Sequence, residues 1–183
     1  MIYNVQTQVL IGTVLGGSSL LKPPKGINYY LSMRGQDKNW ILYKMSEMSD
    51  IFKDLKFHKY GTTYRCNSSC NSMVTEIYYK LYKDGKRKIN MEILNVLTDA
   101  SIAMWFLDSG SKTGRNNKNA YINTTKFGED GSNIIKQYFC EIGMKCNINH
   151  DGIRLKVLFS VEGTEMLFKT IAHRFPLFMC HRL

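Results

Sequence analysis

Long apolar runs are missing from this sequence, which limits where the chain can work. The longest, Val9 to Gly17, is too short for the roughly twenty residues that a membrane-spanning helix needs. No Lys or Arg precedes it, so it also lacks the basic segment of a secretory signal. Asn, Lys, Ile and Tyr are abundant, as in AT-rich genomes. We therefore expect a protein that is neither secreted nor membrane-bound, in an organelle such as the mitochondrion or in phage-infected cytoplasm.

Acidic residues are also scarce. The chain has 15 Asp and Glu against 25 Lys and Arg, a net charge of +10, and its first 36 residues contain no acid. A positive surplus on a folded domain favours polyanionic partners, of which nucleic acid is the commonest. Because 44% of the residues are hydrophobic and 12% aromatic, the chain can fold. This composition excludes a disordered basic tail.

Paired metal-binding motifs are missing as well. The five cysteines are an odd number, and their spacings do not match a zinc site. The four histidines do not form the helical pair that binds a metal ion. We predict reduced thiols, no bound metal and no other cofactor.

The order of expected elements repeats along the chain. Apolar periodicity predicts helices and alternation predicts hairpins, in the same order in both parts. A basic turn at residues 84–90 separates the two, and Asn90 and Thr98 are candidate caps for the helices that follow. We predict an α+β fold, a monomeric pseudo-two-fold tandem αββαββα repeat with halves 1–90 and 91–183. The expected helices are 7–16, 38–54, 71–83, 97–110, 129–144 and 162–175, and the hairpins around them include 57–69, 111–127 and 145–160.

Two segments carry a family resemblance. LIGTVLGGS (Leu10–Ser18) and IAMWFLDSG (Ile102–Gly110) resemble the signature helices of the LAGLIDADG homing endonucleases, in the single-chain group that carries both copies. The patterns WxLYKxxxM, YRxxSS, DGKRKI and PLFMxxRL also resemble that group in order and spacing. The resemblance implies two central helices in contact through Gly12, Gly16 and Ala103. It also implies two antiparallel four-stranded sheets that form a saddle on nucleic acid.

The resemblance further implies which side chains face the nucleic acid. Lys and Arg of the hairpins would neutralise phosphates or contact guanine, and Tyr would stack or donate a hydrogen bond. The alternative for each basic residue is an ordinary solvated cation. The candidates are Lys22, Lys25, Tyr30, Arg34, Lys59, Tyr64 and Arg65 in the first half, and Lys112, Arg115, Lys118, Tyr121, Lys126, Arg154 and Lys156 in the second.

The catalytic positions depart from the family pattern. Cutting members end each signature helix with a carboxylate that binds a divalent metal ion. The matching positions here are Gly17 and Ser109, and neither supplies a carboxylate. Asp108 precedes Ser109, but one step along a helix turns a side chain by about 100°. We expect Asp108 to accept a hydrogen bond at the helix end rather than to bind metal.

Loss of both acids predicts a nucleic-acid-binding protein that no longer cleaves. We expect RNA rather than DNA as its partner, in an intron maturase or as a component of a ribonucleoprotein such as an organellar ribosome. One alternative is an active Mg²⁺-dependent, site-specific DNA homing endonuclease. A further alternative is a structural protein that uses the saddle for protein contacts.

Overall fold

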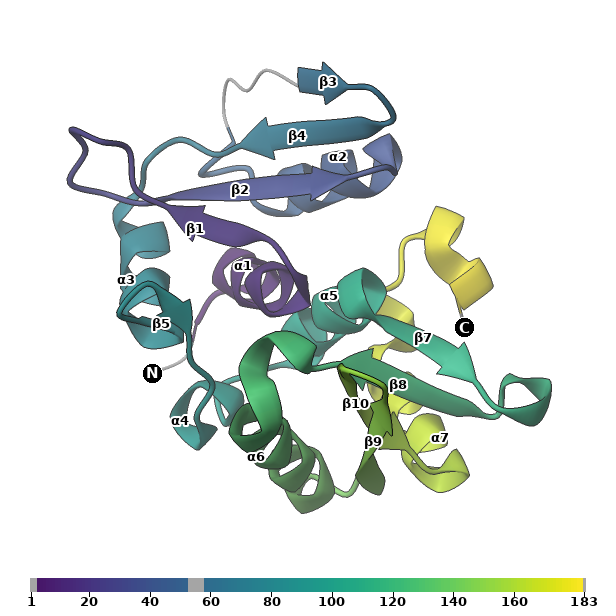
Figure 1. Cartoon of the computed structure of the whole chain (residues 1–183). Helices are drawn as coiled ribbons and strands as arrows, with labels where there is room; N and C mark the ends of the chain where they lie inside the picture. The colour runs from purple at the N-terminus through teal and green to yellow at the C-terminus, as the bar shows by residue number, and fades with distance from the viewer. Residues whose placement is uncertain (1–2, 53–57, 183) are drawn as a thin grey trace.

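Two helices lie side by side at the centre of the molecule (Figure 1). The computed structural model describes residues 3–52 and 58–182. Helix α1 (Val5–Gly16) begins after Asn4, whose side chain accepts a hydrogen bond from Thr7 N, and helix α5 (Asp99–Ser109) begins with a capping box between Thr98 and Ser101. Almost every residue of both helices is buried, because sheets and helices surround the pair.

Gly12 lets the two helices approach closely. A Cβ atom built on Gly12 would lie 2.2 Å from the carbonyl oxygen of Ser101, so no larger residue fits without moving α5. Ala103, on the facing helix, is completely buried. The expected contact of the two signature helices through small residues is therefore confirmed.

The first sheet is antiparallel and has the strand order β1-β2-β4-β3. In β2, Leu31 and Met33 are buried, and in β4 Cys66 is buried, so one face of the sheet packs on the core. Helices α2 and α3 lie on that face (Figure 1). The elements are β1 (Ser19–Leu21), β2 (Tyr30–Gly35), α2 (Lys38–Glu47), β3 (His58–Tyr60), β4 (Thr63–Asn67) and α3 (Ser72–Leu81).

The second sheet repeats this arrangement with the order β7-β8-β10-β9. Ala120, Ile122, Val157 and Phe159 point to the core, where helices α6 and α7 cover them. The matching order of strands and helices confirms the tandem α+β repeat. The elements are β7 (Gly110–Thr113), β8 (Asn119–Asn123), α6 (Gly128–Glu141), β9 (Cys146–Asp151), β10 (Arg154–Phe159) and α7 (Val161–Ile171).

Several elements differ in length from the sequence expectation. The helix expected over 38–54 ends at Glu47, and residues 53–57, which include its last two residues and the start of the expected hairpin at 57, lie outside the described part. The junction at 84–90 contains a short hairpin of β5 (Tyr82–Lys83) and β6 (Lys86–Arg87), turned by Asp84 and Gly85 at positive φ. Asn90 then caps helix α4 (Met91–Leu94), as expected.

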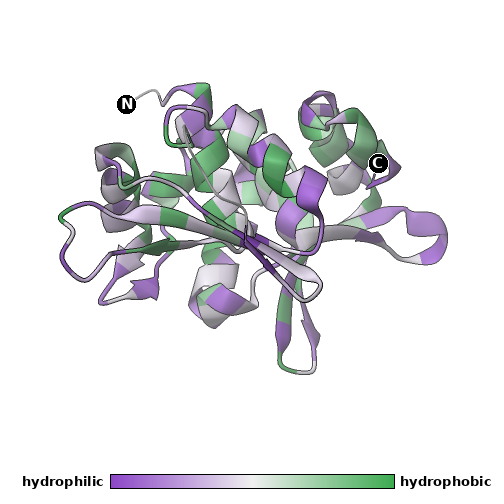
Figure 2. Cartoon of the chain, turned by 90° about the horizontal axis from the view of Figure 1, so that it is seen from above, coloured by the Kyte–Doolittle hydropathy of each residue, from purple (hydrophilic) through white to green (hydrophobic). Residues whose placement is uncertain are grey.

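Short 3₁₀ turns complete the chain: η1 (Arg115–Asn117), η2 (Thr125–Phe127), η3 (Ala172–Arg174) and η4 (Leu177–Arg182). Figure 2 shows hydrophobic stretches along the central helices, and hairpin ends that mix hydrophilic and hydrophobic residues. Among the described helices, none combines the length and the apolar character that crossing a bilayer requires. All five cysteines, which fall in described segments, are free thiols. The division into halves 1–90 and 91–183 stays a prediction.

Candidate nucleic-acid interface

Each sheet leaves one face uncovered by its own helices. Because side chains alternate along a strand, the residues between the buried ones share the opposite face. In the first sheet these include Tyr30, Ser32 and Arg34 of β2, and Arg65 and Asn67 of β4. We refer to this surface as the open face of the first sheet.

Three basic side chains form a row across the open face of the first sheet. Arg34 is paired in register with Arg65, and Arg65 is paired with His58 on the next strand. Like charges directly opposite each other on neighbouring strands are unfavourable. This row, Arg34-Arg65-His58, is called the basic row below, and its charge arrangement suits an anionic ligand that lies across the strands.

A groove of about 700 Å³ runs from the basic row to the end of helix α1. Its lining includes Gly17 at the helix end, Ser32 of β2, and both Arg34 and Arg65. Ser32 donates a hydrogen bond to the Asn67 side chain over 2.8 Å. The groove therefore connects the first sheet with the position where the sequence predicted a lost metal ligand.

The open face of the second sheet is rich in asparagine. Alternation places Tyr121 of β8 and Lys156 of β10 on this face, and the Lys156 ammonium lies 4.8 Å from the centre of the Tyr121 ring. Lys156 also donates to Asp151 over 2.7 Å. The same alternation adds four side chains that the sequence analysis missed: Asn119, Asn123, Asn147 and Asn149. Their signal is the spacing of the asparagines, two positions apart in β9 and four positions apart in β8 with Tyr121 between them, which places them on one face. Asparagine is the amide that pairs with adenine edges.

The predicted contact residues divide into two groups. Open faces carry six of the fourteen candidates, and the connecting turns carry five more. The other three, Lys59, Tyr64 and Lys112, lie on the faces that the helices cover. Tyr64 is on the same side of β4 as the buried Cys66, and Lys59 is its cross-strand partner. The Lys112 ammonium lies 5.5 Å from the centre of the Phe168 ring on α7. The open-face group is Tyr30, Arg34, Arg65, Tyr121, Arg154 and Lys156; the turn group is Lys22, Lys25, Arg115, Lys118 and Lys126.

The ends of the two central helices do not offer ligands for a divalent cation. Gly17 follows α1 with φ +152°, a backbone conformation that favours glycine, and it has no side chain. The Ser109 hydroxyl donates to the carbonyl of Trp105 over 3.0 Å, so it is already engaged within its helix. Within the described residues, no group of three or more His, Cys, Asp or Glu side chains could hold a metal ion.

Asp108 is enclosed by helix α2. One carboxylate oxygen accepts hydrogen bonds from Trp40 Nε1 at 2.5 Å and from Lys44 Nζ at 2.8 Å, and the other lies 3.0 Å from the same ammonium. The Lys44 and Asp108 side chains are 5% and 12% exposed. As expected, Asp108 accepts hydrogen bonds at the helix end. Its charge is paired with the ammonium of Lys44.

Arg87 occupies the end of α1 instead. Its Nη2 donates to the carbonyls of Gly17 at 3.1 Å and Ser18 at 2.5 Å, and its Nε donates to the Tyr82 hydroxyl at 3.1 Å. The sequence analysis assigned this residue to a basic junction between the halves. No pattern in the sequence indicates that the junction folds back onto the helix end.

Lys126 lies in the 3₁₀ turn η2, which follows β8. Its side chain is half-buried in η2. Burial and the nearby charge of Arg87 lower the pKa of Lys126 to about 7, although Asp108 opposes the shift. A lysine with such a pKa exchanges its proton near neutral pH.

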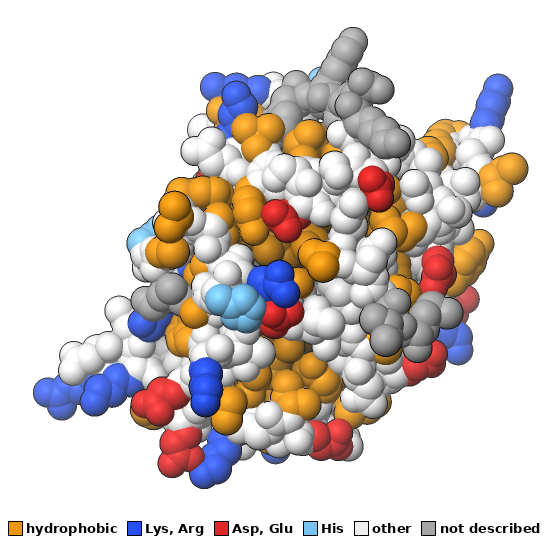
Figure 3. All heavy atoms as spheres, turned by 180° about the vertical axis from the view of Figure 1, so that it is seen from behind, with side chains coloured by type: hydrophobic (Ala, Val, Ile, Leu, Met, Phe, Trp, Pro, Cys, Tyr) orange, Lys and Arg blue, Asp and Glu red, His pale blue; other side chains and the backbone are white. Residues whose placement is uncertain are grey.

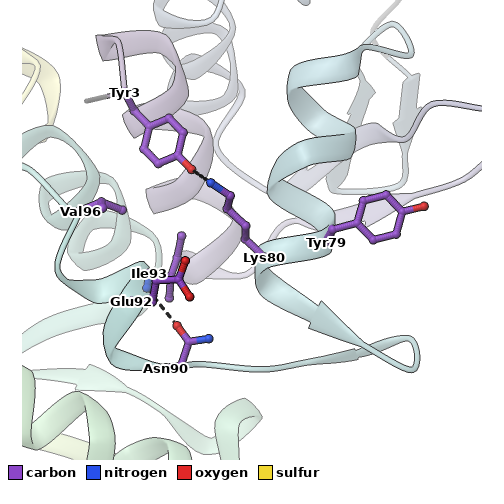
Figure 4. A pocket seen from close by; sticks show the side chains of 7 residues that line it. All are labelled: Tyr3, Tyr79, Lys80, Asn90, Glu92, Ile93 and Val96. Atoms are coloured by element: carbon purple, nitrogen blue, oxygen red, sulfur yellow. Dashed lines mark hydrogen bonds between the residues drawn. The ribbon is translucent and has the colours of Figure 1, made fainter. Parts of the chain in front are cut away.

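Other surfaces are less suited to a polyanion. A pocket of about 500 Å³ between α1, α3 and α4 is lined by Tyr3, Lys80, Glu92 and neighbouring residues, and Tyr3 and Lys80 point toward one another in it (Figure 4). Lys80 also pairs with Glu76 at 3.1 Å. The face seen from behind mixes acidic, basic and exposed hydrophobic side chains (Figure 3). The open faces and the groove are therefore the candidate interface.

Comparison with known proteins agrees with this architecture. The model of the LAGLIDADG DNA endonuclease family matches residues 7–167, which is most of the chain. This chain belongs to the LAGLIDADG DNA endonuclease family. The expected family membership is thus confirmed, with both signature helices inside the matched range.

Three similar proteins place this LAGLIDADG chain among its relatives. A probable intron-encoded endonuclease 1 of Wickerhamomyces canadensis is 23% identical over 159 residues, 80% of this chain and 68% of the relative. A RecA protein of Mycolicibacterium fallax is 23% identical over 119 residues, 63% of this chain but only 28% of that protein. The homing endonuclease I-WcaI, solved bound to its DNA recognition sequence, has a TM-score of 0.87 at 18% identity, covering 100% of this chain and 87% of that one.

Proposed function

We propose that this LAGLIDADG chain binds nucleic acid along the open faces of its two sheets and does not cut it. The basic row carries the proposal, because its three basic side chains are in register across the open face and two of them, Arg34 and Arg65, line the groove, an arrangement that an anion across the strands would stabilise. The net charge of +10 supplies long-range attraction to a polyphosphate.

The proposed loss of cleavage rests on the ends of the central helices. Gly17 has no side chain, the Ser109 hydroxyl is used within α5, and Asp108 is paired with Lys44 and Trp40. Metal-assisted cleavage of a phosphodiester needs ligands that hold the metal beside the reacting atoms. These residues do not provide such ligands, so binding without cleavage is the function that the site supports best.

We propose duplex DNA as the ligand, and a similar solved structure supports this choice. I-WcaI was solved on its DNA recognition sequence, and its fold covers this whole chain. The arginines of the first sheet suit guanine edges, and the asparagines of the second suit adenine edges. The expected preference for RNA, and a role in a ribonucleoprotein, stay predictions that the same assay tests.

The binding experiment compares duplex DNA with RNA. The protein is incubated in EDTA with a random-sequence duplex DNA library or with a structured RNA pool of equal length, and bound molecules are selected and sequenced. We expect enrichment of duplex DNA and an affinity that falls steeply with salt, because phosphate contacts release counterions. Enrichment of RNA alone would replace DNA by RNA as the ligand. Weak, salt-insensitive binding to both would contradict the proposal and favour a protein-binding saddle.

The cleavage experiment uses the enriched duplex with excess Mg²⁺ or Mn²⁺. We expect the duplex to stay intact during prolonged incubation. Cleavage that disappears in the Asp108→Asn variant would instead establish the alternative, an active endonuclease. The matched control is Lys169→Ala, an exposed lysine on α7 away from the open faces.

A further inference from the structure

Three tyrosine rings are stacked on one another beside strand β1. The ring of Tyr29, the residue before β2, stacks on Tyr78 of α3 with ring centres 3.7 Å apart and ring planes 20° apart. Tyr78 stacks in turn on Tyr82 of β5, at 4.7 Å and 13°. All three residues are half-buried, so the protein core does not enclose them. We refer to Tyr29, Tyr78 and Tyr82 as the tyrosine stack.

A cation lies at each end of the tyrosine stack. The Lys22 ammonium is 5.9 Å from the centre of the Tyr29 ring, and the Arg87 guanidinium carbon is 5.9 Å from the centre of the Tyr82 ring. The Tyr82 hydroxyl is fixed, because it accepts hydrogen bonds from Arg87 Nε at 3.1 Å and from Leu20 N of β1 at 3.3 Å. Lys22, by contrast, is exposed, and its ammonium is close to the limit of about 6 Å for a cation–π contact. A planar ligand therefore reaches the Tyr29 end by displacing only a flexible side chain.

The tyrosine stack lines a pocket of about 490 Å³ that adjoins the groove. This volume is within the range of about 300–1,000 Å³ that is typical of small-molecule sites. Lys22 and Arg87 also line the pocket, and among its described lining residues none is acidic. Ser19 and Leu21 of β1 line both this pocket and the groove at the end of α1. A strand bound in the groove can therefore continue past β1 into the pocket.

We propose that this pocket binds an unpaired nucleotide of the nucleic acid. The base stacks on the Tyr29 ring, and the adjoining phosphate accepts a hydrogen bond from Lys22. Stacking on aromatic side chains beside cations is how proteins hold single strands, and it tolerates every base because each has a π-face. A base inside a duplex has to leave the helical stack before a protein ring can cover it. The inference rests on the proposed function, since the groove leads the strand to the pocket, and it specifies the ligand as duplex DNA joined to a single-stranded segment.

The first test separates base stacking from phosphate attraction. Affinity is measured in EDTA for a mixed-sequence DNA duplex with short single-stranded flanks, and for the same duplex with abasic flanks of equal length. We expect the flanks with bases to increase the affinity about 5-fold to 100-fold, as expected from stacking of one base on an aromatic ring. Tyr29→Leu should abolish this increase, and Tyr29→Phe, which keeps the ring, should retain it. The matched control is Tyr79→Leu, because Tyr79 is an exposed tyrosine of α3 that does not line the pocket.

The second test locates the unpaired base in the wild-type protein. The flanks carry 5-iodouracil, which crosslinks to adjacent aromatic side chains under near-ultraviolet light, and mass spectrometry of the peptides identifies the crosslinked residue. We expect Tyr29. This measurement keeps the inference testable if Tyr29→Leu does not fold.

The outcomes distinguish this inference from the proposed function. Equal affinity for flanks with and without bases, an increase that survives in Tyr29→Leu, or crosslinks confined to residues outside the pocket would overturn the nucleotide site. Tight binding of the duplex with abasic flanks would still support the proposed function in that case. Failure to bind that duplex at any salt concentration, with a retained crosslink from a free single strand to Tyr29, would contradict the proposed function and not the pocket.

Discussion

Replacing Asp108 by alanine should destabilise the protein strongly. The carboxylate is the common acceptor of Lys44 Nζ and Trp40 Nε1, at 2.8 Å and 2.5 Å, in a place where the Lys44 side chain is only 5% exposed. The alanine variant leaves a buried ammonium without its counter-charge and a buried indole N–H without an acceptor. Removal of one partner of a buried ion pair costs about 3–5 kcal/mol. Because small domains have total stabilities of about 5–15 kcal/mol, this loss is a large fraction.

The matched variants separate the ion pair from the shape of the site. Lys44→Met alone leaves Asp108 buried with Trp40 as its donor and should cost about 3–5 kcal/mol as well. In the double variant Lys44→Met with Asp108→Asn, no charge is buried, and the amide oxygen still accepts from Trp40. We expect this double variant to be more stable than Lys44→Met and than the single variant Asp108→Asn, and the cycle of these three variants should give a coupling of about 2 kcal/mol or more.

Urea unfolding followed by tryptophan fluorescence and by circular dichroism measures these differences. Where Asp108→Ala is too unstable to fold, the double variant still reports on the pair. Two results would refute the reasoning: single variants as stable as the wild type, or a double variant that loses the full sum of the single losses. A third result would show that Asp108 binds metal. In that case added Mg²⁺ would raise the urea midpoint of the wild type but not the midpoint of the Asp108→Asn variant.

Three further predictions concern other parts of the molecule. Gly12→Ala should lower the free energy of unfolding by about 1–3 kcal/mol or more in urea titrations, because its Cβ would meet the Ser101 carbonyl at 2.2 Å; a neutral effect would contradict the close helix contact. Burial raises the pKa of Asp99, but hydrogen bonds from Arg174 and His173 outweigh it, so the net pKa lies below 3.8. The stability that separates wild type from Asp99→Asn should therefore be present above about pH 4 and disappear as the pH falls further, whereas a constant difference would argue against this ion pair. Arg65→Ala should reduce the slope of log affinity against log salt by about one, and an unchanged slope would remove Arg65 from the phosphate contacts.

The sequence by itself determined the repeat and the class of fold. Apolar positions at helical spacing and alternation in the strands are local patterns, so they predicted the order of elements in both parts. The glycine at position 12 indicated a close helix contact, because only a residue without a side chain allows it. The absence of carboxylates at Gly17 and Ser109 was likewise visible in the sequence alone.

The tertiary structure decided which side chains meet. Lys44 and Asp108 are 64 positions apart, and no local pattern indicates that α2 brings them together. The faces of Tyr64 and Lys112 depend on strand register, in which a shift of one residue moves a side chain to the other side of the sheet. Arg87 reaches the end of α1 only because the junction folds into a hairpin beside it. Periodicity acts over neighbouring residues, whereas Lys44, Asp108 and Arg87 come from three separate segments, α2, α5 and β6, that only the packed core brings to the central helices.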